Sequence, residues 1–409
     1  MTILCLLVMT GLLNTQQPAT DQRAEAERLA RTGAYAEALQ RFEAMVAANP
    51  DDYEARIWVG RMMNRLGNPD RAAEVFRSVI AAKPDSADAL VGLGAALAAL
   101  DQPAEAIEEL NRAEKLAPDD PELLAAQGAA HLAAGHVKLG LAYYRRAVLL
   151  RPADPVIREA DADARRKYGH YISATGYFES YSEFAPDTWS GSIELNARAT
   201  DQLRLIARGQ MQDKFDESEG RGGGGIEWLP TRRVAFRGVA LFSSNTTVLP
   251  RIDAYGEVGY TKRRISVAGG MQYVSFEPGL SGLQTARAWF AMPILTVRVN
   301  DDFLIVARYA HSWSEFDSGG SWVGNDSGSI GAQLRLLPRA WVGVAWAGGV
   351  ESFDTLSVDR LGDFNANTVR GDVRLDLRSL TSIAGAYEYQ WREGDLQMMR
   401  VTFGLVQRF

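Results

Sequence analysis

Strict alternation of residue types marks residues 369–378, whose sequence is VRGDVRLDLR. Successive side chains of an extended strand point to opposite faces, so one face would carry Val, Gly and Leu and the other only Arg and Asp. A strand buried between two apolar layers cannot hold such a charged face, which must contact water or a polar interior. A membrane β-barrel meets this demand, because its strands carry apolar residues toward lipid and polar residues toward the lumen.

The same alternation recurs in the C-terminal half of the chain, at residues 203–212, 330–336 and 383–392. The chain ends on Phe409, and Val401, Phe403 and Leu405 would share its face in a strand. A final strand that ends in an aromatic residue resembles the signal read by the assembly machinery of Gram-negative outer-membrane barrels. We therefore expect a bacterial outer-membrane protein in contact with outer-membrane lipid.

A short apolar run, Ile3–Leu13, opens the chain and is followed by polar residues. This run is too short to span a bilayer and is typical of a secretory signal peptide, which we assign to residues 1–18. The alternative is a buried N-terminal helix. Cys5, the only cysteine, lies in this run and receives no role, and a single cysteine excludes a disulfide framework.

Four prolines, Pro50, Pro84, Pro118 and Pro152, lie 34 residues apart, which is the period of the tetratricopeptide (TPR) repeat. Small residues recur where the two helices of a repeat would cross, and large residues recur between repeats. The small residues are Ala26, Gly60, Gly94 and Gly128, and the large residues are Phe42, Phe76, Leu110 and Tyr144. Gly33, Gly67 and Gly135 mark the turn inside a repeat, with Asp101 at the corresponding place in the third repeat.

The resemblance to TPR proteins covers residues 19–152, and residues 153–168 are typical of a capping helix and linker. It implies a curved helical scaffold that binds a protein partner, here a periplasmic one, on its concave face. A spacer or folding handle for the barrel is the alternative.

Short and long connections alternate from residue 169 to the end of the chain. The short connections are 200–201, 230–233, 261–264, 300–302, 337–340 and 378–381. Together with seven longer ones they predict a barrel of 14 strands over residues 169–409, with 12 or 16 strands as alternatives. The expected fold class is therefore α + β multidomain: a TPR α-solenoid followed by an antiparallel transmembrane β-barrel.

Charged residues recur on the predicted inner faces of these strands. The predicted lumen-lining set is Glu194, Arg198, Arg204, Arg208, Arg308, Arg335, Arg370, Asp372, Arg374, Asp376, Glu388 and Arg392. These charges either form salt-bridge networks that fill a narrow barrel or line a water-filled path for a polar or anionic solute. The sequence does not decide between the two, because it does not fix the width of the lumen.

The segment VLPRIDAYGEVGYTKR, residues 248–263, and the Gly-, Tyr- and Trp-bearing strands after it resemble the YaiO-type outer-membrane barrel family. This resemblance implies a location and no assigned activity. The two-part layout is also similar to that of bacterial exopolysaccharide exporters, in which a longer TPR array precedes a barrel.

Catalytic and metal-binding motifs are not evident in the sequence. The tetraglycine Gly222–Gly225 lacks the Lys-Ser/Thr of a phosphate loop and is interpreted as a flexible outer loop or a thin wall. His311 would share the lipid-side face of Tyr309 and Trp313, while Ser312 and Ser314 point inward, so we expect an interfacial histidine rather than a catalytic one. We expect no enzyme activity, no metal and no cofactor.

The net charge of -7 and the pI near 5.4 argue against nucleic-acid binding, which needs a basic surface. The sequence therefore predicts an outer-membrane barrel with a periplasmic TPR scaffold that serves transport or export of an envelope polysaccharide or polar solute. The alternative is a membrane-anchored, protein-binding platform without a conducting pore.

Overall fold

The computed structural model describes residues 19–182, 187–214, 217–244, 249–276, 286–316, 321–349, 365–378, 380–393 and 397–409. The predicted signal peptide and Cys5 lie outside these residues. The chain forms two compact units, Met1–Ile157 and Arg158–Phe409.

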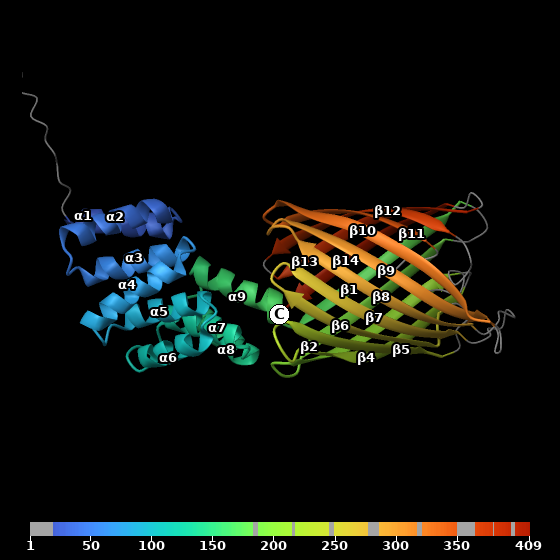
Figure 1. The fold of residues 1–409 in the computed structure, drawn as a ribbon, viewed down its shortest axis with the longest axis horizontal. Coiled ribbons are helices and arrows are strands. Elements are labelled where there is room, and N and C mark those ends of the chain that lie inside the picture. Colours follow the sequence, from blue (N-terminus) through green and yellow to red (C-terminus); the bar gives the residue numbers. More distant parts are fainter. Residues whose placement is uncertain are drawn as a thin grey trace, which may run out of the picture. The chain divides into compact units, whose positions relative to one another are not determined.

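The first unit is helical (Figure 1). Its helices are α1 (Ala19–Arg31), α2 (Tyr35–Ala48), α3 (Tyr53–Arg65), α4 (Pro69–Ala82), α5 (Ala87–Ala99), α6 (Pro103–Glu114), α7 (Pro121–Ala134) and α8 (Val137–Leu150). Helix α9 (Pro155–Tyr168) follows, in the segment where the sequence predicts a capping helix. Among the described residues, no helix has both the length and the apolarity required to cross a membrane.

Small and large residues alternate in the repeat core as the 34-residue period predicts. Phe42, Phe76 and Leu110 are fully buried. A Cβ atom on Gly60 would lie 2.7 Å from the Phe76 ring, so only glycine lets helix α3 approach that ring so closely. The predicted turn residues adopt the left-handed conformation, in which Asp101 has φ 60° where the other repeats have glycine.

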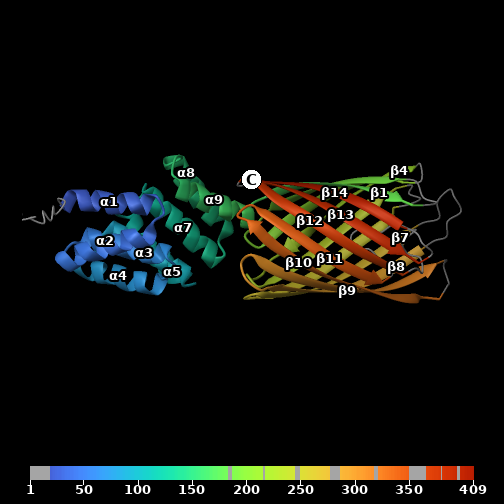
Figure 2. The same cartoon turned by 90° about the horizontal axis from the view of Figure 1, so that it is seen from above.

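The second unit is a closed antiparallel barrel (Figures 1 and 2). Its strands are β1 (Tyr171–Tyr181), β2 (Thr188–Arg198), β3 (Leu203–Lys214), β4 (Glu217–Trp228), β5 (Val234–Ser243), β6 (Ile252–Lys262), β7 (Ile265–Phe276), β8 (Ala286–Arg298), β9 (Phe303–Phe316), β10 (Val323–Leu337), β11 (Ala340–Gly349), β12 (Ala366–Arg378), β13 (Thr381–Arg392) and β14 (Gln397–Arg408). Each strand pairs with its neighbours in sequence, and β1 pairs with β14. The predicted strand number of 14 and the predicted fold class are confirmed.

The barrel closes at the last residue of the chain. The His170 amide donates to the Phe409 carbonyl and the Phe409 amide donates to the His170 carbonyl, both at 3.1 Å. Each predicted short connection overlaps a link between two strands on the same end of the barrel as this closure.

The tetraglycine Gly222–Gly225 lies within strand β4, so its interpretation as a flexible loop is wrong. A Cβ atom on Gly223 would lie 2.0 Å from the Ala240 carbonyl oxygen of β5. The glycines are needed because two strand backbones approach closely, and not because the segment is a loop. The sequence also predicts a long connection centred on residues 317–326, but residues 323–326 of it begin strand β10.

The two faces of the barrel wall differ in chemistry. Exposed apolar side chains cover the outer face, among them Ile193, Met211 and Phe403. The inner face is mostly polar, with one apolar cluster of Val274, Phe276, Ala286, Ala288 and Phe290 on β7 and β8. This cluster lies at the end of the barrel opposite to the chain terminus, where β7 ends and β8 begins.

Candidate functional site

All twelve residues of the predicted lumen-lining set lie in strands and alternate with outward-facing apolar residues. On β12, for example, Val369, Val373 and Leu375 are exposed on the outer face, and Arg370, Asp372, Arg374 and Asp376 lie on the other face. Whether these residues line a conducting path stays a prediction.

A buried ion network joins four neighbouring strands through Glu388 of β13. Its Oε1 accepts from Arg370 of β12 and its Oε2 from Arg400 of β14, at 2.7 and 2.8 Å. Arg400 also donates to Glu179 of β1 at 2.7 Å. The Arg400 side chain is only 2% exposed, so its guanidinium group is removed from water, and the carboxylates of Glu179 and Glu388 compensate for the lost hydration.

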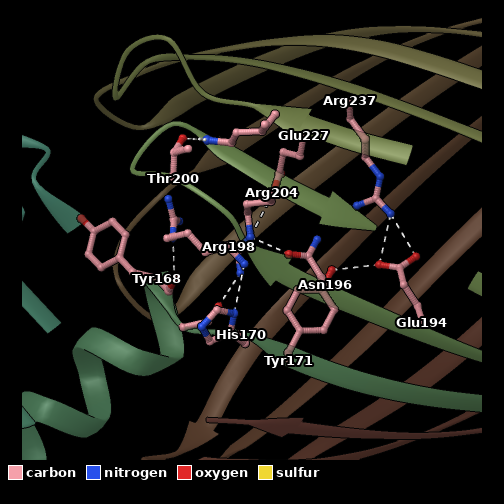
Figure 3. Close-up of polar contacts among 12 residues, drawn as sticks. Tyr168, His170, Tyr171, Glu194, Asn196, Arg198, Thr200, Arg204, Glu227 and Arg237 are labelled. Carbon is pink, nitrogen blue, oxygen red and sulfur yellow. Dashed lines mark hydrogen bonds and ion pairs between the residues drawn. The ribbon is translucent and has the colours of Figure 1, made fainter. Parts of the chain in front are cut away.

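The second polar group lies where helix α9 leads into β1 (Figure 3). Arg198 of β2 donates to the Tyr168 carbonyl at 2.9 Å and to the Asp201 carbonyl at 2.7 Å. Arg204 of β3 donates to Asn196 at 2.5 Å and also to the Gly169 carbonyl. Both guanidinium groups thus bind carbonyls at the C-terminal end of α9, which carries the negative end of the helix dipole.

Ion pairs on the inner face also join strands that are not neighbours. Glu194 of β2 accepts from Tyr171 at 3.0 Å and from Arg237 of β5 at 3.1 Å (Figure 3). Arg221 of β4 donates to Asp253 of β6 at 2.8 Å. These contacts reach past the intervening strands, so they lie inside the barrel.

The remaining predicted residues have other local partners or none among the described residues. Arg335 pairs with Asp302 at 2.6 Å, Asp376 accepts from Ser382 at 2.7 Å, and Arg392 donates to Gln390 at 2.7 Å. Arg374 stacks over Trp341, with 5.2 Å to the ring centroid. No ion pair or hydrogen bond links Arg208 or Arg308 to another residue in the described part of the chain.

Two cavities border the charged inner-face residues, and the first of them is mainly polar. The first, of about 320 Å³, is lined by Arg208, Arg221, Arg370, Arg400, Glu388 and hydroxyl and amide side chains of β1 to β3 and β14. The second, of about 250 Å³, lies beside Arg308, Asp372 and Gln333. Both cavities are lined by Arg370 and Glu388, so this ion pair lies between them.

Sequence reasoning missed several charged residues of the inner face, namely Glu179, Arg221, Arg237, Asp253, Glu257 and Arg400. Arg237 is the single charged residue of β5, and Arg400 lies between Met399 and Val401 of β14, so alternation with apolar neighbours was a usable signal. Arg221 was missed because the polar, glycine-rich run around it predicts a loop.

His311 lies on the face of Tyr309 and Trp313, as predicted. Its Nδ1 atom is 2.6 Å from Asp326 of β10, which Tyr309 also contacts, and its ring meets Trp313 edge-on at 4.4 Å. Asp317, which the sequence places nearby, lies outside the described residues. Within the described residues no group of three or more His, Cys, Asp or Glu side chains is arranged to hold a metal ion.

In the helical unit, ion pairs tie the first helices of successive repeats together. Arg61 of α3 contacts Asp88 of α5 at 2.8 Å and Glu122 of α7 at 3.0 Å. Arg23 of α1 contacts Asp52 at 2.6 Å, and the Asp52 side chain caps α3 by accepting from the Ala55 amide. Burial alone would raise the pKa of Asp52, but the Ala55 amide and Arg23 outweigh it, so this pKa lies below its ordinary value.

A polar cluster lies inside the fourth repeat. The His131 ring stacks on Tyr143, and its Nδ1 atom lies 3.2 Å from Nδ1 of His136. Gln127, which is 1% exposed, donates to Glu114 at 3.1 Å. Burial, together with His136, lowers the pKa of His131, while Glu114 acts in the opposite direction. The lowered pKa favours the neutral form of the His131 ring.

Comparison with known proteins identifies the helical unit. Sequence profiles of the tetratricopeptide repeat match residues 23–87 and 64–130. A thermophilic TPR protein from Thermus thermophilus is similar at 25% identity, over 36% of this chain and 81% of that one, with a TM-score of 0.34. MamA from Desulfovibrio magneticus is similar at 24% identity, over 36% of this chain and 84% of that one, with a TM-score of 0.29.

These scores are too low to support a shared function, and a search of curated proteins gives no match. The repeat profiles agree with the 34-residue period of the sequence and with the helix pairs of the structure. The chain therefore carries tetratricopeptide repeats in its N-terminal part, followed by a closed antiparallel β-barrel of 14 strands.

Proposed function

We propose that this chain is a bacterial outer-membrane protein that serves as a transport or export component for an envelope polysaccharide or a polar solute. The observation that supports this most is the contrast between the two faces of the barrel wall. Phe403 and Ile193 are exposed on the outer face, whereas Arg308 and Arg374 are exposed on the inner face. An apolar belt suits lipid, and exposed guanidinium groups inside the barrel need water.

The lengths of the connections support one direction of the barrel in the membrane. Outer-membrane barrels have short turns on the periplasmic side and longer loops outside the cell. The short turns lie at the end of the barrel where α9 enters β1 and where His170 meets Phe409. With that end in the periplasm, the TPR repeats that precede α9 are periplasmic.

The YaiO-type resemblance of residues 248–263 is consistent with this location and names no solute. A polysaccharide is the preferred cargo because hydroxyl, amide and guanidinium groups line the inner cavities. His311 is proposed to be an interfacial residue without a catalytic role, and neither a metal nor a cofactor is part of this proposal.

A protein-binding platform is the second candidate. TPR repeats bind other proteins in general, and Arg61, Asp88 and Glu122 form a charged surface on successive first helices. The buried network around Arg400 also fills part of the barrel with matched charges, as a barrel that serves only as an anchor would require.

Membrane fractionation and planar-bilayer recording of the full chain test the two candidates. A transport component is recovered in the outer membrane and gives discrete conductance steps, and its deletion removes a surface polymer or slows entry of a polar solute. Recovery in the outer membrane without conductance, together with capture of a defined periplasmic protein, would favour the platform. Absence from the outer membrane would contradict both.

A further inference from the structure

The cavity of about 320 Å³ on the inner face has an uneven balance of charge. Its wall contains four guanidinium groups, those of Arg208, Arg221, Arg370 and Arg400. Among the described residues of this wall, Glu388 supplies the single carboxylate. Other carboxylates bind these arginines without lining the cavity, and they also count toward the local charge balance.

Three of the four arginines each bind at least one carboxylate. Arg221 binds Asp253 at 2.8 Å. Arg370 and Arg400 share Glu388, and Arg400 also binds Glu179, so these two cations meet two carboxylates within 2.8 Å. Asp372 adds a more distant contact to Arg370, at 3.9 Å.

Arg208 is the exception. It lies directly opposite Glu194 in the pairing of β2 and β3, but Glu194 binds Arg237 and Tyr171 instead. No ion pair or hydrogen bond joins Arg208 to any residue among those described. The cavity therefore holds one guanidinium group whose donors are directed to no carboxylate of the described chain.

Neutral polar side chains cover the wall beside Arg208. Thr175, Ser192 and Gln210 occupy directly paired positions on β1, β2 and β3, and Thr402 lies opposite Tyr177. All of them line the cavity. Gln210 accepts from Arg221 at 2.8 Å and donates to Ser190 at 3.3 Å, so its amide is engaged within the wall. The hydroxyl groups of Thr175, Ser192 and Thr402 can both donate and accept hydrogen bonds, as the hydroxyl groups of a sugar do. The volume of the cavity is within the range that holds small organic ligands, about 300 Å³ and above.

We propose that this cavity binds a monoanionic sugar acid, with its carboxylate on the Arg208 guanidinium and its hydroxyl groups on the Thr175, Ser192 and Thr402 wall. A planar guanidinium group binds a carboxylate through two parallel hydrogen bonds. Because Arg208 is the one guanidinium group of this wall without a carboxylate partner among the described residues, a ligand with one negative charge fits it best. The inference deepens the proposed transport function by naming a class of solute, and binding is measured separately from conductance so that either can fail alone.

The test is calorimetric titration of the detergent-solubilised full chain with D-glucuronate, D-glucose and inorganic phosphate. Glucuronate is expected to bind, with affinity about tenfold or more above that of glucose, because a charge-assisted hydrogen bond is lost with the neutral sugar. Arg208→Gln is expected to remove that difference. Arg308→Gln, which alters an inner-face arginine of the other cavity, is the matched control and should leave it unchanged.

Equal affinity for glucose and glucuronate, or undiminished glucuronate binding by Arg208→Gln, would overturn the assignment of Arg208. Phosphate binding without glucuronate binding would overturn the sugar-acid class. No binding of any probe by a chain that still conducts ions would overturn the binding site and leave the transport function intact.

Discussion

Arg370 and Glu388 are paired positions on β12 and β13, and the Arg370 Nη1 atom lies 2.7 Å from Glu388 Oε1. The pair lies between the two inner cavities and also anchors Arg400 through the second oxygen of Glu388. Structural stability and any passage through the barrel therefore depend on the same few side chains.

Removing Arg400 should destabilise the barrel strongly. Arg400→Met leaves Glu179 and Glu388 buried without this cation, and breaking one partner of a buried ion pair costs about 3–5 kcal/mol. Urea unfolding in detergent, followed by tryptophan fluorescence, measures the change. Arg374→Met is the matched control, because Arg374 is exposed on the inner face and should change the free energy of unfolding by only about 0.5 kcal/mol. Equal effects of the two substitutions would contradict the network.

Removing Arg204 should loosen the junction between α9 and β1. Arg204→Ala deprives the Gly169 carbonyl and Asn196 of their donor, at a cost of about 1–3 kcal/mol. Hydrogen exchange at the Gly169 and His170 amides should become about tenfold faster or more if local opening governs it. Arg208→Ala, on the same face of the same strand, should leave this exchange unchanged. Similar acceleration in both variants would show that the arginine contacts do not hold the junction.

Gly223 should tolerate no side chain. A Cβ atom there would lie 2.0 Å from the Ala240 carbonyl oxygen, so Gly223→Ala must shift β4 or β5, at a cost of about 1–3 kcal/mol or more. Gly209→Ala on β3 is the control, because a Cβ atom at Gly209 would meet nothing within 4 Å. Urea midpoints of the two variants compare them directly. A stable Gly223→Ala barrel would mean that the strands are farther apart than described.

The fourth repeat should lose stability in mild acid. The pKa of His131 lies below its ordinary value of 6.5 because the ring is buried and lies beside His136. The unfolded chain therefore takes up a proton at a higher pH than the folded chain, and stability falls as the pH drops below about 6.5 toward the folded pKa. Thermal melting of the helical circular dichroism signal at pH 7 and at lower pH measures this.

His131→Gln should reduce that pH dependence, because the residue no longer titrates. His136→Gln should keep part of it, since burial of His131 remains. An unchanged pH profile in His131→Gln would assign the effect to another group.

Much of this fold could be predicted because its signals repeat. Prolines and small residues that recur every 34 residues show where each TPR repeat begins. Asp101 adopts the same left-handed turn conformation as the glycines at the corresponding positions of the other repeats. In the barrel, period-two alternation and short polar turns were enough to count the strands. A closed barrel leaves few alternatives once the strand number is known, because every strand must find two partners.

The candidate site was harder to predict because the partner of each charged residue depends on the pairing register of the strands and on the length of the side chains. Sequence alternation placed Arg370 and Glu388 on inner faces, but only the pairing of β12 with β13 makes them opposite. Arg237 and Glu194 join strands that are not neighbours, a contact set by side-chain length and barrel curvature. Arg221 was not predicted to line the lumen because the glycines beside it, which allow two strands to approach closely, are also typical of a loop.

The proposed transport function requires that the inner face of the barrel border a water-filled path. Single-channel recording of the full chain with Thr402→Cys, which lines the larger of the two inner cavities, in a background with Cys5→Ser measures this. Val401→Cys, the next residue on β14 and on the outer face, is the control. We expect discrete conductance steps that a charged, membrane-impermeant methanethiosulfonate reduces in Thr402→Cys and leaves unchanged in Val401→Cys. Absence of steps, or equal effects at the two positions, would contradict it.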